Sequence, residues 1–164
     1  MRMLDIPSIS AIAAAVGVLV GVVIAVVELR NLVKQRQTDV VWRMFQAWNS
    51  GEFLDVLPKA WNMALSDFGE FTRKYGDLSS ENNPAAKPIT MIATFFEEVG
   101  FLVSKKLVSL DHVYQLLPVT QWWEKLKPIV EGMRKQWNMP EAYCWFEYLY
   151  NELQKREQRG VRVG

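Results

Sequence analysis

The chain has 164 residues, of which 50% are hydrophobic and 12% aromatic, and its formal net charge is +1. This near-neutral balance argues against a nucleic-acid-binding protein, which would carry a strong basic excess. The single cysteine, Cys144, excludes an internal disulfide and is typical of a reducing compartment.

An uncharged apolar run, Ile9 to Val27, follows the first few residues. As a helix, its nineteen residues would measure about 28 Å, close to the hydrocarbon thickness of a bilayer. The run is longer than the apolar core of a cleaved signal peptide, and it ends in Glu28-Leu29-Arg30 rather than an Ala-x-Ala site. We therefore expect residues 1–27 to form a flank and a retained transmembrane helix; a buried core helix is the alternative.

The orientation of this segment is predicted from its basic flanks. Only Arg2 precedes the run, whereas four basic residues follow it: Arg30, Lys34, Arg36 and Arg43. Because basic residues accumulate on the cytoplasmic side, we expect a single-pass protein of the cell membrane with its N-terminus outside and its C-terminal domain cytoplasmic.

Small residues recur every fourth position in the apolar run, at Ala13, Gly17, Gly21 and Ala25. On a helix they form one ridge, and the Gly17–Gly21 pair would allow a second helix to approach closely. We interpret the ridge as a helix-packing face for a second copy (a homo-oligomer) or for other membrane proteins. Because Gly and Ala are common in membrane helices, a chance pattern is the alternative.

Residues 28–50 are predicted to form a membrane-proximal helix. Neither Gly nor Pro occurs between Val22 and Ser50, so we expect one helix from about residue 8 to residue 49. A joint at the polar segment Gln35 to Asp39 is the alternative. Ser50-Gly51 should end the helix, with Gly51 in the left-handed conformation.

Residues 51–153 predict an all-α cytoplasmic domain, a compact bundle of about four to five helices without strands. Proline and capping residues mark the expected helix starts: Pro58, Pro88, Ser109, Thr120 and Pro140. Gly76 should end the first of these helices, and the polar stretch 77–87 should form a loop. Residues 154–164 read as a basic, flexible tail.

Short motifs give the chain a resemblance to a known group. They are Phe95-Phe96-Glu97-Glu98-Val99-Gly100, Leu107, Val113, Trp122-Trp123 before Leu126 and Pro128, and Phe146-Glu147-Tyr148-Leu149. With the apolar run, they resemble uncharacterised bacterial and archaeal membrane proteins that have one N-terminal span and a cytoplasmic all-helical domain of unknown function. The resemblance implies a fold and a location, and no activity.

Residues with catalytic or metal-binding chemistry are sparse. His112 is the only histidine, and the paired His or Cys ligands of zinc and di-iron sites are missing. Four carboxylates could meet between helices as a magnesium or calcium site, although surface charge is the favoured interpretation: Glu97, Glu98, Glu131 and Glu147. Cys144 lies between Tyr143 and Trp145, as expected for a packed thiol. We predict no catalytic residue, no metal and no cofactor.

Trp122 and Trp123 are adjacent, and two neighbouring side chains of one helix cannot face the same side. We therefore expect one of them to be partly exposed, or to contact a partner or the lipid interface. The same argument applies to Phe95-Phe96. Packing between helices and a small-molecule pocket are the alternatives.

These features predict a non-catalytic protein, not an enzyme, that serves as a membrane-anchored interaction, scaffolding or regulatory module at the cytoplasmic face. One alternative is an accessory subunit of a larger membrane complex. Another is a tethered small-molecule sensor. The expected partners are the lipid bilayer and a second copy or other membrane proteins, with no nucleic acid.

Overall fold

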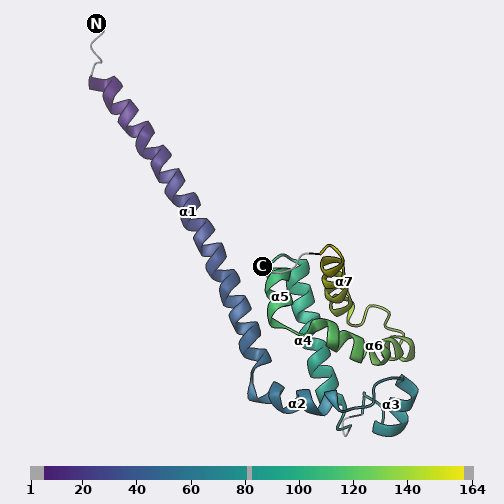
Figure 1. Ribbon diagram of the computed structural model, residues 1–164. Helices are drawn as coiled ribbons and strands as arrows, with labels where there is room; N and C mark the ends of the chain where they lie inside the picture. The colour runs from purple at the N-terminus through teal and green to yellow at the C-terminus, as the bar shows by residue number, and fades with distance from the viewer. Residues whose placement is uncertain (1–5, 81–82, 161–164) are drawn as a thin grey trace. The chain divides into compact units, whose positions relative to one another are not determined.

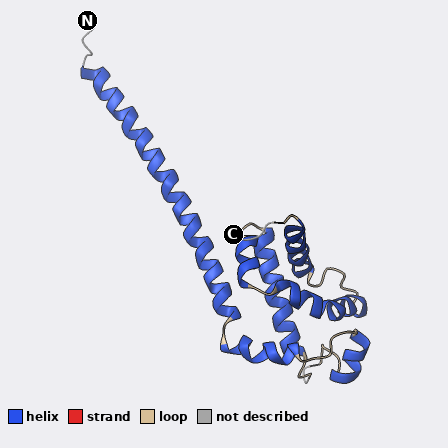
Figure 2. Cartoon of the chain, viewed as in Figure 1, coloured by secondary structure: helices blue, strands red, loops and turns tan. Residues whose placement is uncertain are grey.

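The computed structural model describes residues 6–80 and 83–160, with side chains from residue 14 onward. This part of the chain contains seven helices and no strand, which confirms the all-α prediction (Figure 2). The chain divides into two compact units, residues 1–39 and 40–164, and each is described by itself.

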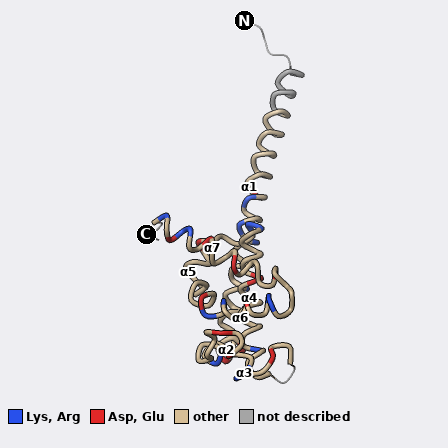
Figure 3. The backbone as a smooth tube through the Cα atoms, turned by 90° about the vertical axis from the view of Figure 1, so that its right-hand side faces the viewer, with Lys and Arg blue, Asp and Glu red and all other residues tan. Residues whose placement is uncertain are grey.

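Helix α1, Ile6–Trp48, is continuous, so the structure has one helix rather than a joint at residues 35–39 (Figure 1). Every side chain described between Ala14 and Asp39 is exposed. Within α1 lies a stretch with a mean hydropathy of 2.2, and no other helix of the described residues is long and apolar enough to cross a membrane. The basic residues begin where this uncharged stretch ends (Figure 3).

Gly51 does not take the left-handed conformation that the sequence predicted. It is the first residue of α2, Gly51–Trp61, because the Ser50 hydroxyl accepts a hydrogen bond from the Phe53 N–H at 3.3 Å and caps this helix. Pro58 lies inside α2 instead of opening a helix.

A separate helix, α3, covers Phe68–Tyr75. Its N-cap is Asp67, whose carboxylate accepts the Glu70 N–H at 2.8 Å. Gly76 ends it with a φ of 90°, as predicted for a glycine past a helix end. The expected single helix from Pro58 to Tyr75 is therefore two helices.

Four further helices complete unit 40–164: α4 (Ala86–Ser104), α5 (Leu110–Leu116), α6 (Val119–Gln136) and α7 (Cys144–Gln158). Six helices thus follow α1, more than the four to five predicted. The last begins at Cys144 rather than at Pro140, because residues 140–143 form turns that end with Tyr143 at a φ of 56°. It also continues through residues 154–158, which were predicted to be a flexible tail. Residues 161–164 of that tail lie outside the described part.

Helix α4 forms the centre of this unit and packs against α2, α6 and α7 (Figure 1). Its inward face is almost completely inaccessible to solvent, with Ile92 and Phe96 at 0% exposure. Aromatic rings fill the space around it, including Phe96 stacked on Phe146 of α7 at 4.8 Å between centroids. These large side chains let a short sequence bury a substantial core.

Candidate functional site

The small-residue ridge of α1 makes no contact within the described chain. A Cβ added to Gly17 or Gly21 would meet nothing within 4 Å, and Ala25 is exposed. The side chain of Ala13 lies outside the described residues. The helix-packing face therefore stays a prediction.

Trp122 and Trp123 are both buried, at 4% and 2% exposure, so the expectation that one is exposed is wrong. The reason is that α6 is covered on two sides. Trp122 packs edge-on against Trp61 of α2 at 5.3 Å, while Trp123 packs against Phe146 of α7 at 4.9 Å. Phe95 and Phe96 are likewise both buried, at 7% and 0%. Exposure therefore gives no support for a partner contact at Trp122 or Trp123.

Three of the four carboxylates considered for a metal site have separate partners, and the fourth, Glu98, is exposed. Glu147 pairs with Arg134 at 2.7 Å, Glu131 lies 3.8 Å from Lys127, and Glu97 reaches the start of α7. Across residues 6–80 and 83–160, no three His, Cys, Asp or Glu side chains are arranged to hold a metal ion. His112 is exposed.

Instead, the structure brings chemistry-bearing residues together where α4 meets the start of α7. The Glu97 carboxylate accepts the Phe146 backbone N–H at 2.8 Å, so a side chain of α4 satisfies an otherwise unpaired donor at the N-terminus of α7. Its negative charge also suits that end of the helix dipole. One turn on, Gly100 lets the helices touch: a Cβ there would lie 2.5 Å from the carbonyl carbon of Trp145.

An open apolar groove borders this junction. Its first part, about 270 Å³, lies between α1 and α4, with Val40, Met44, Phe95, Val99 and Leu102 among its walls. Its second part, about 440 Å³, lies between Phe101, Leu102 and Trp145. Glu98, which is exposed, borders both parts. The groove therefore offers hydrophobic contact beside both acidic and basic groups, Glu97, Glu98 and Arg43.

Residues 12–153 match a family described as a domain of unknown function, DUF4760. The chain belongs to the DUF4760 family. The match begins within the apolar part of α1 and ends near the close of α7, so it takes in both units. No curated protein and no solved structure matches the chain.

Within the DUF4760 region, the motifs behind the sequence resemblance fall largely at the α4–α7 junction. Phe96, Glu97 and Gly100 of the first motif contact Phe146 or its neighbour Trp145 at the start of α7. These contacts show that part of the motifs encodes helix packing, whereas Glu98 and Leu107 are exposed.

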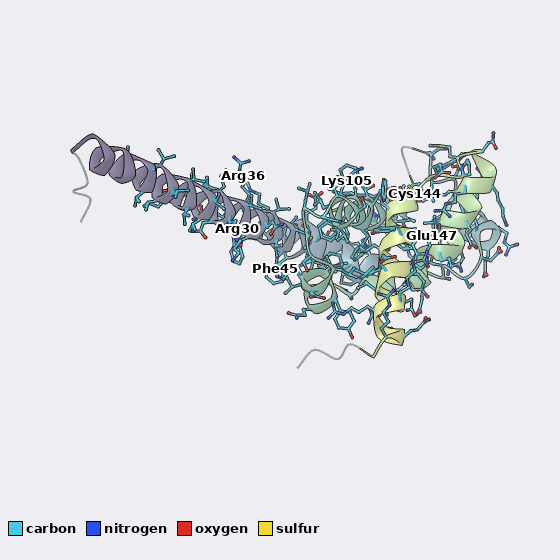
Figure 4. The ribbon with its side chains drawn as sticks, turned by 90° about the horizontal axis from the view of Figure 1, so that it is seen from above. Arg30, Arg36, Phe45, Lys105, Cys144 and Glu147 are labelled. Atoms are coloured by element: carbon cyan, nitrogen blue, oxygen red, sulfur yellow. The ribbon has the colours of Figure 1, made fainter. Side chains whose placement is uncertain are left out.

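The Cys144 thiol sits at the same junction, 3.8 Å from the Glu97 carboxylate (Figure 4). Burial raises the pKa of this thiol, and the negative charges of Glu97 and Glu141 raise it further. A nucleophilic cysteine needs the opposite environment, one that lowers its pKa. The arrangement supports the packing interpretation of Cys144.

Sequence reasoning missed Glu97 as a helix cap and Gly100 as a contact point. An isolated glycine within a helical pattern signals a close approach of another backbone, so Gly100 could have been found. The role of Glu97 could not, because the capped helix lies more than forty residues away along the chain.

Proposed function

We propose that this DUF4760 protein is a non-catalytic, single-span membrane protein whose helical domain acts by contact at the cytoplasmic face, as an interaction, scaffolding or regulatory module. The exposed apolar surface of α1 carries the proposal. Val18 and Leu19 are 67% and 65% exposed, and neighbouring valines are similar. A continuous apolar surface of this kind is not left in water by a soluble protein, and a bilayer would cover it.

The basic residues after the apolar stretch support a cytoplasmic position for residues 40–164. The test uses Met139→Cys in a Cys144→Ser background, since Met139 is 54% exposed. We expect a membrane-impermeant maleimide to label this cysteine in inverted vesicles and not in intact cells. Labelling in intact cells would overturn the orientation.

Action by contact is supported by the partly buried arginines of residues 40–164, which join helices to one another. Arg134 bonds both the Ala142 carbonyl and Glu147, which ties α6 to α7. Arg156, largely buried, pairs with Asp111 and so ties α7 to α5. These groups hold the bundle together, and the part of the apolar groove lined by Val40, Met44 and Phe95 remains as the surface that a partner could cover.

An accessory subunit of a larger membrane complex is the second candidate, favoured by the open space at Gly17 and Gly21. Gly17→Leu/Gly21→Leu should then release proteins that co-purify with the wild type in mild detergent, or dissociate a homo-oligomer. Val18→Leu/Val22→Leu is the matched control, because it changes exposed positions off the ridge. Equal recovery from both variants would show that the ridge is not the docking face.

A further inference from the structure

A cluster of aromatic, aliphatic and basic side chains lies at the C-terminal end of α4 and includes the part of the groove between Phe101, Leu102 and Trp145. We name it the α4-end patch: Phe101, Leu102, Lys105, Lys106, Leu107 and, from α7, Trp145. Phe101 is 42% exposed and Leu107 is 48% exposed. The exposure of these large apolar side chains to solvent, next to two lysines, calls for a physical reason.

Lys105 lies beside two aromatic rings of the patch. The Lys105 ammonium lies 5.4 Å from the centre of the Phe101 ring and 5.9 Å from that of Trp145 (Figure 4). Neither Lys105 nor Lys106 forms an ion pair with any described residue. The patch thus combines two exposed lysines with apolar side chains, and the carboxylates Glu97 and Glu98 border it on the side of Phe101 and Trp145.

At the patch, a residue other than glycine has the left-handed backbone conformation. The Lys106 N–H donates to the Val103 carbonyl and the Leu107 N–H to the Leu102 carbonyl, both at 2.9 Å, which closes α4 in a left-handed turn. Lys106 occupies the left-handed position, with a φ of 58°, where glycine is strongly preferred. Lys106 therefore places an exposed charge at a position where the backbone alone would favour glycine.

Chain connectivity limits what can cover the patch. Trp48 packs on Phe95 at 5.2 Å, while Val40 and Leu102 share one groove, so the end of α1 and α4 run antiparallel. The end of α4 is therefore at the side of unit 40–164 where the chain enters. Thirteen residues lead from Val27 to Val40, and because they belong to the continuous helix α1 they span about 20 Å.

We propose that the α4-end patch is a second membrane contact, which docks on the anionic phospholipid headgroups of the bilayer that holds α1. The inference rests on the proposed membrane anchor. Aromatic rings suit the interface between headgroups and hydrocarbon, and lysines suit the negative surface of the cytoplasmic leaflet. Each basic residue near such a surface contributes about fivefold to partitioning, so the two lysines together favour docking about 30-fold.

The test places a fluorescent probe on Ser104→Cys, in full-length Cys144→Ser protein in nanodiscs, and quenches it with headgroup-nitroxide lipid. Two further probe sites serve as controls: Val20→Cys within the apolar stretch, and Leu54→Cys, exposed on α2 at the other end of α4. In discs with anionic lipid we expect strong quenching at position 104 and little at position 54. In purely zwitterionic discs, quenching at position 104 should fall.

Charge variants then test the lysines. Lys105→Gln/Lys106→Gln should weaken docking about 30-fold, whereas Lys127→Gln/Lys135→Gln, elsewhere on the exposed surface, should not. Lys106→Gly should weaken docking about fivefold while raising the unfolding temperature, which separates lost contact from lost folding.

Quenching at position 104 that matches position 54, or that ignores lipid charge and both lysines, would overturn the second contact. In that case, quenching of the probe at position 20 by a nitroxide placed within the acyl chains would still support α1 as a membrane anchor. An unquenched probe at position 20 would instead refute the anchor itself.

Discussion

Replacing Gly100 with alanine tests the α4–α7 junction most sharply. The added Cβ would lie 2.5 Å from the Trp145 carbonyl carbon and 3.2 Å from its Cβ. Backbone atoms cannot rotate away as a side chain can, so α7 must move. That movement pulls the Phe146 N–H from the Glu97 carboxylate, now 2.8 Å away.

Two opposing effects determine how much Gly100→Ala changes the free energy of unfolding. Overpacking in a filled core costs about 1–3 kcal/mol, and the rigid backbone here places the cost near the upper end. Exchanging glycine for alanine inside a helix stabilises the folded state by about 0.5–1 kcal/mol. We expect a net loss of about 2 kcal/mol, or a fall in unfolding temperature of about 7 °C for a domain of this size.

The assay is thermal unfolding in detergent, followed by circular dichroism. Gly51→Ala is the matched control, because a Cβ at Gly51 meets nothing within 4 Å and the residue also lies in a helix. This control should melt at or slightly above the wild-type temperature. If Gly100→Ala did the same, the close approach of α7 to α4 would be refuted.

Three further predictions concern the same unit. Glu97→Gln removes a charge that raises the pKa of the Cys144 thiol, so the pH profile of iodoacetamide alkylation should shift to lower pH; an unchanged profile would contradict their proximity. The pKa of Cys144 is raised in the folded state, so its contribution to stability is complete below the ordinary value of 9.0 and is lost as pH rises through the folded-state value. Urea unfolding should therefore show the free energy of unfolding falling above pH 9.0. The fall should be shallower in Cys144→Ser, where only the pKa of Tyr143, raised by burial, still contributes. Identical slopes for the wild type and the variant would refute this. Trp123→Ala should destabilise by about 3–5 kcal/mol, whereas Trp42→Ala, at a side chain 58% exposed, should change stability by less than about 0.5 kcal/mol; comparable losses in urea would contradict the burial of Trp123.

The long N-terminal helix and the all-α class were predictable because they depend on local signals. Apolar content determines the first part of α1, the absence of Gly and Pro after Val22 lets it continue to Trp48, and Gly76 ends α3 as its position suggests. The separation of α2 from α3 was also encoded locally, in the Asp67 cap followed three residues later by Glu70, and was overlooked in favour of Pro58.

The burial of Trp122 and Trp123 could not be predicted in the same way. Adjacent residues point about 100° apart on a helix, so both are buried only when neighbours cover two sides. Here α2 and α7 do so, and both packings join segments distant in the sequence. The α4–α7 junction has the same character, because the helix capped by Glu97 lies far along the chain.

The central claim is that the apolar stretch of α1 lies in a lipid bilayer, and alkaline carbonate extraction of membranes tests it most directly. We predict that the intact chain stays in the membrane pellet. Leu19→Arg/Val23→Arg should move it to the supernatant, since an arginine at the centre of a membrane helix costs about 2.5–3.5 kcal/mol. Recovery of the unaltered chain in the supernatant would contradict the claim.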